Sequence, residues 1–330
     1  MKKFICFLLV LMMTVPITVH AENNKDELLI EAGFPYECIE GLDSDSYKEI
    51  TTTLMEDPSK VQITYCTMDV DNLAEIEDIM SISVNQIVDE DIDPKEVEKL
   101  QRLYKSYLDM SDKDLSHYLE VPEEEARYIK MAIDSGILKN GNNNKIDNEV
   151  VTSGSISTSN LTYAQSVVNK STATAPKYDI TLTYHWSNVF AQSLYNDVIA
   201  VTWGGGLNVQ SKSGTAHYYS FDNGGWLVRK SSKSMTTNET VQKGIKYSFK
   251  QSINNEGNLQ MPYKSKSGTA KATIYQTQFQ GYATNIVSKY YHKKTSMAAS
   301  IIFNSSGVGI SVSPTTVYDE SPQRSSSITY

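Results

Sequence analysis

The sequence predicts an α+β multidomain protein, in which an acidic N-terminal helical region is followed by an all-β antiparallel sandwich or barrel-like domain. Three observations support this prediction: charge changes sign near residue 150, the apolar spacing changes from helical to alternating, and glycines divide the second half into short runs. We expect a signal peptide at 1–21, an acidic mainly helical domain at 22–138, a polar linker at 139–176 and a basic β-sandwich domain at 177–330.

Charge is divided unevenly between the two halves. Residues 22–150 hold 32 Asp and Glu against 12 Lys and Arg, whereas residues 151–330 hold 7 against 16. The two halves therefore present electrostatic fields of opposite sign. Phosphates are repelled by the acidic helices, which together with an export signal excludes nucleic acid as a partner.

The first 21 residues have the three parts of a secretory signal peptide. Two lysines precede an apolar run at 4–15, and a Val-His-Ala triplet ending at Ala21 suits a cleavage site. The alternative is an uncleaved membrane anchor, but Pro16 breaks the run, which falls short of the ~20 residues that span a bilayer. We expect a secreted protein that is cleaved after Ala21.

Helix signals follow one another through the acidic region. Asp93 is a candidate N-cap, Pro94 stands at the first helical position, and apolar residues continue at helical spacing to Leu108. Further helices are expected from 111, from 122 to a stop at Gly136, and more weakly at 26–32 and 45–55. Residues 61–66 alternate and predict one strand.

Two cysteines, Cys38 and Cys66, remain after the leader. An even number of cysteines in an exported chain favours a disulfide. Closing a loop of about 29 residues would stabilise the fold by ~3.6 kcal/mol in the chain-entropy model. The alternative is two buried free thiols.

Two acidic runs begin like calcium-binding loops but fail at the positions that matter. The run from Asp89 has Pro94 at its sixth position, where the loop needs glycine, and Leu100 at its twelfth, where it needs glutamate. The run from Asp43 fails at the same two positions. We expect no metal site and no cofactor.

The period of the sequence changes after a polar stretch. Residues 140–144 are the expected boundary, and 156–168 could still hold a strand. Beyond Lys177, alternation predicts a series of strands at 179–186, 197–203, 215–221, 245–250, 270–279, 297–303 and 308–312. The segment Ser-Lys-Ser-Gly-Thr-Ala occurs at both 211–216 and 265–270. We interpret it as a favourable turn sequence, with a duplicated hairpin entry as the alternative.

No motif for catalysis is present. Four histidines follow the leader without metal-ligand spacing, and no nucleophile stands out beside a base. The sequence therefore assigns no catalytic residue and favours a protein that is not an enzyme. A hydrolase with an unrecognised site remains an alternative.

Aromatic residues interleave with Lys and Arg throughout the β region. Such rings stack on sugars or lie at membrane interfaces, and lysines attract anionic polymers. The candidate ligand-binding residues are Tyr184, Trp186, Trp203, Tyr218, Tyr219, Trp226, Lys246, Lys250, Tyr290 and Tyr291. An alternative interpretation places these aromatic residues in an ordinary sandwich core.

The favoured function is a secreted, non-enzymatic binding protein, whose partner is an anionic cell-wall polymer, a glycan or a membrane surface. The acidic helices would act as a spacer or as a mask that competes for the basic strands. Separating the halves at 140–144 should then strengthen binding by 151–330. The alternative is a pore-forming or antibacterial toxin with an acidic restraining region. The layout is typical of secreted proteins of low-GC Gram-positive bacteria, and no named family is matched.

Overall fold

A computed structural model describes most of the chain. The described residues are 25–83, 92–119, 123–140, 158–187, 195–221, 227–255, 258–295, 297–304 and 309–330. The predicted leader with its cleavage site, most of the predicted 140–144 boundary and the candidate residue Trp226 lie outside them.

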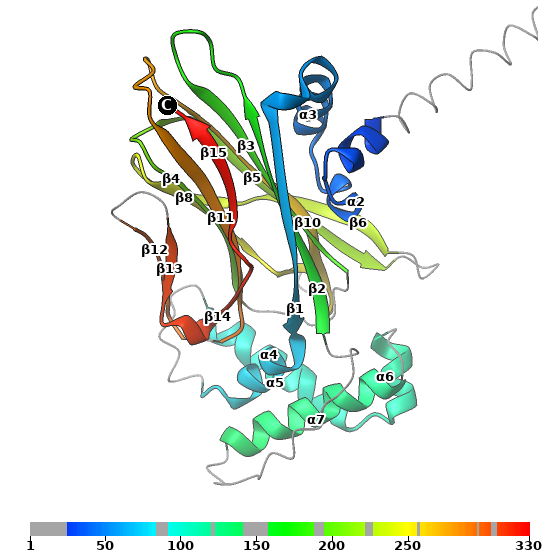
Figure 1. Cartoon of the computed structure of the whole chain (residues 1–330). Helices are drawn as coiled ribbons and strands as arrows, with labels where there is room; N and C mark the ends of the chain where they lie inside the picture. The colour runs from blue at the N-terminus through cyan, green and yellow to red at the C-terminus, as the bar shows by residue number, and fades with distance from the viewer. Residues whose placement is uncertain are drawn as a thin grey trace, which may run out of the picture.

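Two antiparallel sheets pack face to face, as the predicted sandwich requires (Figure 1). Sheet A has the order β1 (Val61–Asp71), β2 (Thr158–Asn169), β3 (Lys177–Trp186), β10 (Asn258–Tyr275), β5 (Asn208–Phe221) and β6 (Leu227–Ser234), with β9 (Ser252–Asn255) pairing β10. Sheet B has the order β14 (Tyr318–Glu320), β11 (Ala283–Lys293), β4 (Asn196–Trp203), β8 (Gly244–Lys250) and β7 (Thr236–Thr240), with β15 (Arg324–Thr329) pairing β11. A separate hairpin joins β12 (Ser300–Phe303) to β13 (Ile310–Ser313). The predicted α+β class with a β-sandwich is confirmed.

Helices of the acidic half lie in two places (Figure 1). Residues 25–31, α2 (Tyr36–Ile39) and α3 (Ser44–Glu56), followed by the short η1 (Pro58–Lys60), lie beside sheet A. Across one end of the sandwich lie α4 (Asn72–Ser81), α5 (Pro94–Leu108), α6 (Asp112–Leu119) and α7 (Glu123–Asn140). One more short helix, η3 (Thr315–Val317), precedes β14.

The predicted helix starts are confirmed, but one predicted stop is wrong. The Asp93 side chain accepts a hydrogen bond from the Lys95 backbone at 2.9 Å, which caps α5. Helix α7, however, continues through Gly136 to Asn140. A Cβ on Gly136 would lie 2.5 Å from the Cβ of Met80. The glycine therefore allows α7 to pack closely against α4 rather than ending the helix.

The acidic half contributes a full strand to the sandwich. The strand predicted at 61–66 is confirmed as β1, which pairs with β2 along all of its 11 residues. Because β2 spans Thr158–Asn169, this part of the predicted linker is wrong. A cut near 140–144 would leave β1 on the other fragment from the sheet to which it belongs. Residues 151–330 alone would therefore lack the intact fold that the prediction of stronger binding assumes.

The predicted disulfide is wrong, because Cys38 and Cys66 lie on opposite faces of sheet A. Cys66 is paired with Tyr163 and packs in the core between the sheets. Cys38 packs on the outer face with Ala164 and Val168. Both thiols are free and buried, and burial raises the pKa of each. Each donates to a backbone carbonyl, that of Thr162 for Cys38 and that of Pro322 for Cys66.

The repeated hexapeptide lies inside strands, so its interpretation as a turn is wrong. The two copies pair with each other in the centre of sheet A, with Thr215 of β5 opposite Thr269 of β10. On either side of this pair, a glycine of one copy faces an alanine of the other. A Cβ on Gly268 would lie 2.6 Å from the Thr215 carbonyl oxygen, so the backbones approach too closely for a side chain.

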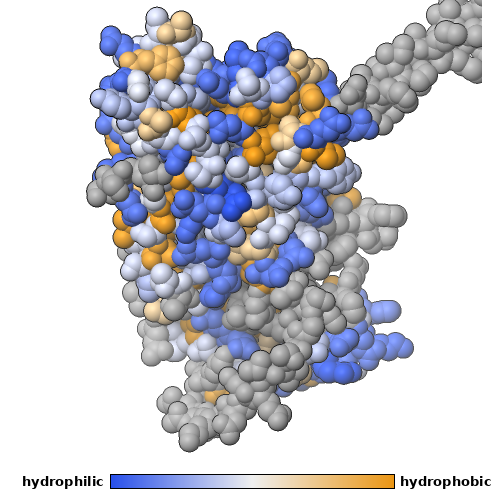
Figure 2. All heavy atoms as spheres, viewed as in Figure 1, coloured by the Kyte–Doolittle hydropathy of each residue, from blue (hydrophilic) through white to orange (hydrophobic). Residues whose placement is uncertain are grey.

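The visible surface differs in polarity between regions. Hydrophilic residues cover much of the face drawn in Figure 2, and apolar residues gather at its upper right, near residues 25–31 and α3. Ile30 and Met55 of these two helices are 45% and 57% exposed. This apolar area lies beside sheet A, away from the β12–β13 hairpin.

Candidate functional site

A pocket of about 260 Å³ lies on the outer face of sheet B, between that face, the segment leading into β12 and the residue preceding the α5 cap. Alternation along β4, β8 and β11 directs one set of side chains outward to this pocket and the other set into the sandwich. The pocket is lined by Ile92, Tyr195, Asn196, Val198, Asn238, Lys246, Ser248, Lys293, Ala298, Ala299, Ser300, Ile301 and Tyr318.

Two lysines give the pocket its charge. Among the described residues that line it, Lys246 and Lys293 are cationic and none is Asp or Glu. Lys293 is only 5% exposed, and its Nζ lies 5.7 Å from the centroid of the Tyr195 ring. Lys246 Nζ donates to the carbonyl oxygen of Ile301 at 3.4 Å. A cation over an aromatic face is attracted by the ring, so Tyr195 stabilises the Lys293 ammonium at the wall of the pocket.

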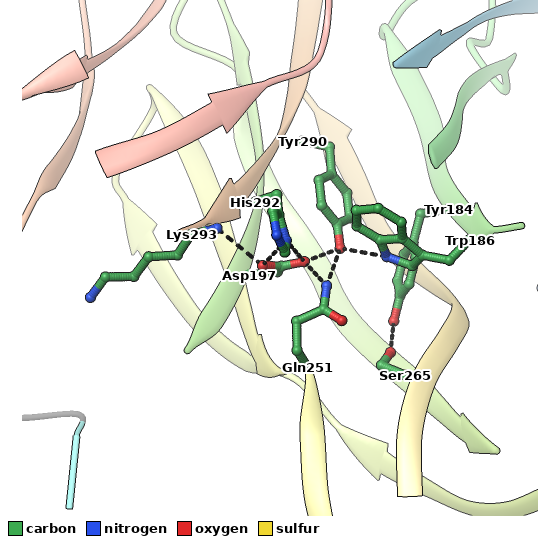
Figure 3. Close-up of polar contacts among 8 residues, drawn as sticks. All are labelled: Tyr184, Trp186, Asp197, Gln251, Ser265, Tyr290, His292 and Lys293. Carbon is green, nitrogen blue, oxygen red and sulfur yellow. Dashed lines mark hydrogen bonds and ion pairs between the residues drawn. The ribbon is translucent and has the colours of Figure 1, made fainter. Parts of the chain in front are cut away.

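A buried carboxylate supports the wall of the pocket from inside the sandwich (Figure 3). Asp197 is fully buried, and its oxygens accept hydrogen bonds from Gln251 Nε2 and the Tyr290 hydroxyl. They also accept from His292 Nδ1 at 3.1 Å and from the Lys293 backbone at 3.2 Å. The carboxylate thus joins β4, β11 and the end of β8.

Aromatic packing closes this cluster off from solvent. Burial and the charge of Asp197 raise the pKa of Tyr290 well above its ordinary value, so the phenol stays protonated and donates. The Trp186 indole donates to the Tyr290 oxygen at 3.3 Å, and its ring lies 5.2 Å from that of His292. Nearby, the Tyr184 hydroxyl and Ser265 share a hydrogen bond of 2.5 Å.

The Asp197 cluster positions pocket residues rather than forming an open reactive site. A carboxylate beside an imidazole is an arrangement used in nucleophilic catalysis. His292, however, is 3% exposed and does not line the pocket. Asn196 and Val198 flank Asp197 on β4, and Lys293 follows His292 on β11. The cluster therefore fixes the backbone from which three pocket residues project.

Most of the aromatic residues predicted to bind ligand lie in the core. The Tyr219 hydroxyl donates to Glu40, the residue after α2, and Tyr219 is 4% exposed; the others are between 0% and 3% exposed. The buried candidates are Tyr184, Trp186, Trp203, Tyr218, Tyr219, Tyr290 and Tyr291. A surface ligand cannot stack on rings buried to this degree, so the sequence interpretation as core residues describes them correctly.

Of the two predicted lysines, Lys246 lines the pocket, whereas Lys250 is not among its lining residues. Lys250 follows Ser248 on the same face of β8, and its Nζ lies 3.3 Å from a carboxylate oxygen of Glu96 on α5. The acidic half therefore places a carboxylate beside a lysine on the same face of β8 as Lys246.

Sequence reasoning missed Tyr195, Asn196, Asn238, Ser248 and Lys293. Alternation along 245–250 puts Lys246, Ser248 and Lys250 on one face, and this signal could have found Ser248. The others come from strands distant in the sequence, which only the order β11-β4-β8-β7 brings together.

Neither a known family model nor a curated protein matches this chain. Several solved structures share limited similarity with it. The C-terminal domain of the Streptococcus agalactiae AgI/II polypeptide BspA is 8% identical over 40% of this chain and 53% of that one, with a TM-score of 0.24. The C-terminal domain of the Streptococcus pyogenes antigen I/II-family protein AspA is 12% identical over 41% and 50%, with a TM-score of 0.25.

A third match is the KRT10-binding region domain of the pneumococcal serine-rich repeat protein PsrP. It is 16% identical over 47% of this chain and 87% of that one, with a TM-score of 0.23. This chain spans about half the length of the antigen I/II structures. TM-scores of this size do not establish a common fold, and they carry no conclusion about function.

Among the described residues, no group of three or more His, Cys, Asp or Glu side chains is arranged to hold a metal ion. None of the described helices is long and apolar enough to cross a membrane.

Proposed function

We propose that this protein is a secreted, non-enzymatic binding protein, whose β region holds an anionic group of a cell-envelope polymer or glycan in the pocket that Lys246 lines. The observation that carries the proposal is the position of Lys246 in a pocket whose described lining residues include no Asp or Glu. The leader at 1–21 supports an extracellular location.

The acidic half acts as a mask as well as a structural support. Three of its carboxylates form ion pairs with lysines of the β region: Asp43 with Lys271, Glu49 with Lys170 and Glu96 with Lys250. Each pair is partly exposed and therefore stabilises the fold by less than about 1 kcal/mol. Their common effect is to occupy basic groups that an anionic polymer would otherwise contact.

Binding to purified cell walls that retain their anionic polymers tests the proposal. The full chain should be retained at about 0.05 M salt and released as salt approaches about 0.5 M, because ionic attraction is screened. Lys246→Gln should be released at lower salt than the wild type. Lys233→Gln is the control, because Lys233 is exposed on β6 of the other sheet.

Two results would contradict the proposal. One is retention that does not change with salt. The other is a release profile of Lys246→Gln that coincides with that of the wild type and of Lys233→Gln.

A further inference from the structure

The turn that follows β4 lies at the end of the sandwich opposite α4–α7, close to the tip of β15 (Figure 1). Its two glycines, Gly205 and Gly206, have positive φ values of 80° and 65°. A Cβ on Gly205 would overlap the ring of Tyr330, the residue after β15. Gly205 therefore allows the Tyr330 ring to lie directly on the backbone of the turn.

A second tyrosine lies beside Tyr330 and is largely exposed. The Tyr282 backbone donates to the Tyr330 carbonyl at 3.1 Å, and the Tyr330 backbone donates to the Tyr282 carbonyl at 2.8 Å. The two ring centroids are 6.1 Å apart, with the planes tilted by 44°. Tyr282 is 62% exposed. Because both backbones are fixed, the rings offer a flat apolar surface to a ligand at little further cost in conformational entropy.

Two exposed carboxamides, those of Gln242 and Asn208, lie at the same turn. Gln242 Nε2 donates to Asn208 Oδ1 at 3.2 Å, and Gln242 Oε1 lies 4.0 Å from where a Cβ on Gly206 would be. This hydrogen bond leaves Gln242 Oε1 to accept and Asn208 Nδ2 to donate, and both side chains are exposed to solvent. Such a pair suits two adjacent hydroxyl groups, because a hydroxyl both donates and accepts.

Gln242 has a backbone conformation that glycine would adopt more easily. Among the described residues it alone has a positive φ without being glycine, at 57°. Residues held in sparsely populated backbone regions cluster at functional sites, where the surrounding structure maintains the strain. This favours a role for the carboxamide, which glycine lacks.

We infer that this turn is a second binding site, which takes an uncharged sugar ring. The C–H face of the ring stacks on Tyr282 and Tyr330, and two adjacent hydroxyls pair with Gln242 and Asn208. The site is separate from the pocket at Lys246. Val198 lines that pocket, and Trp203, just before the turn, lies roughly 17 Å further along β4, since a strand rises ~3.3 Å per residue. The inference therefore does not depend on the proposed function.

Saturation-transfer NMR titration of the full chain tests the inference. The probes are D-glucose, D-galactose and N-acetyl-D-glucosamine, which have a ring and adjacent hydroxyls, and glycerol, which has the hydroxyls without the ring. At least one sugar should bind with a dissociation constant on the order of 10 mM, and glycerol at least about tenfold more weakly. The affinity should be the same at low and high salt, because no charged group pairs with the ligand.

Variants of the exposed tyrosine test the stacking surface. Tyr282→Ala should weaken sugar binding about tenfold, whereas Tyr282→Phe should keep most of the affinity because it keeps the ring. Tyr65→Ala is the matched control, since Tyr65 is 51% exposed on β1. Its affinity for the sugar should equal that of the wild type.

A glycine variant separates a binding role of Gln242 from a structural one. Gln242→Gly relieves the positive φ, so it should resist urea at least as well as the wild type. It should nevertheless bind the sugar several-fold more weakly, because the hydroxyls lose a partner. Unchanged sugar affinity in Gln242→Gly would overturn the site as described.

Three further results would overturn the inference. One is that none of the three sugars binds. Another is an equal loss of affinity in Tyr282→Ala and Tyr65→Ala. The third is an affinity that falls with salt, which would show that exposed Lys243, next to Gln242, holds an anion instead. Salt-dependent retention on cell walls, which tests the proposed function, is a separate measurement, so either idea can fail alone.

Discussion

Apolar packing covers β2 on the outer face of sheet A, whereas a hairpin covers part of the outer face of sheet B. Over sheet A, residues from 25–31, α2 and α3 pack on Ala164 and Val168 of β2. Over sheet B, the β12–β13 hairpin packs on Val198, Ala200 and Tyr291, and a lysine-lined pocket lies at the edge of this contact.

The elements that cover sheet A and sheet B differ in whether they bring carboxylates to the lysines of the strands beneath them. The cover of sheet A brings Asp43 and Glu49, which neutralise Lys271 and Lys170. The described hairpin residues bring no carboxylate to the lining of the pocket, which contains Lys246. Basic residues are thus spread over both sheets, and a pocket lies at the edge of the element that covers sheet B.

The largest expected effect tests the support beneath the pocket. Asp197→Ala should lower the free energy of unfolding by about 4 kcal/mol, because several buried donors lose their acceptor. Asp319→Ala, which removes a partly exposed partner of Lys294, should cost less than about 1 kcal/mol. Urea denaturation of both variants measures this. Equal losses of unfolding free energy in the two variants would show that the Asp197 cluster stabilises the fold no more than a partly exposed ion pair does.

The next-largest effect distinguishes the elements that cover sheet A from the hairpin that covers sheet B. Phe34→Ala should destabilise the protein by about 3 kcal/mol, since Phe34 is 1% exposed in the cover of sheet A. Its affinity for an anionic probe at 25 °C should equal that of the wild type. Ile301→Ala should cost about 2 kcal/mol and also change that affinity, because Ile301 lines the pocket and its carbonyl accepts from Lys246. Changed binding in Phe34→Ala would mean that the faces are coupled.

A smaller effect is the pH dependence of stability, and it concerns sheet A. Burial and the positive charge of Arg229 lower the pKa of His217 from about 6.5 to about 4. The unfolded chain therefore binds a proton between these pH values that the folded chain does not, and stability falls as pH decreases from about 6.5 to about 4.

Allowing for solvent screening, the loss due to His217 should be on the order of 1 kcal/mol. Its ring faces Ser232 at 2.8 Å, with Glu40, Asp43 and Arg229 as the nearby charges. Burial also lowers the pKa of His185, which adds to the same trend. Urea titrations of wild type and His217→Gln at several pH values measure it, and the variant should show a flatter dependence.

The smallest effect concerns the mask beside the pocket. Glu96→Gln should strengthen binding of an anionic probe about threefold, because Lys250 loses its carboxylate partner. Glu98→Gln is the matched control, since Glu98 pairs with Arg102 within the same helix. Titration at low salt measures both. An unchanged affinity in Glu96→Gln would leave this ion pair as a structural contact alone.

The sequence predicts most readily those strands that have one face exposed to solvent. In β8 apolar and polar residues alternate because only one face is fully covered. In β2 and β11 this signal is lost, since the core lies on one side and a covering element on the other. Gln165 and Ser166 of β2 are fully buried although they are polar, and the sequence analysis placed them in a linker that could still hold a strand at 156–168.

The candidate site was predictable only where it lies along one strand. Lys246 was predicted correctly because charge and alternation on β8 are local properties. Lys293 and Asn196 depend on the pairing of β11, β4 and β8, which is a property of the fold. The aromatic residues were judged by composition, but whether a ring faces solvent or a second sheet is decided by tertiary packing.

The paired hexapeptides of β5 and β10 have a consequence for how the chain assembles. Because the two copies are identical and antiparallel, each is also complementary to the same segment of another molecule. In concentrated refolding mixtures the central pairing of sheet A can form between chains before it forms within one, which is the route to domain-swapped dimers. The pairing at the centre of the native sheet is therefore also the place where a segment of a second chain could substitute for the chain's own segment.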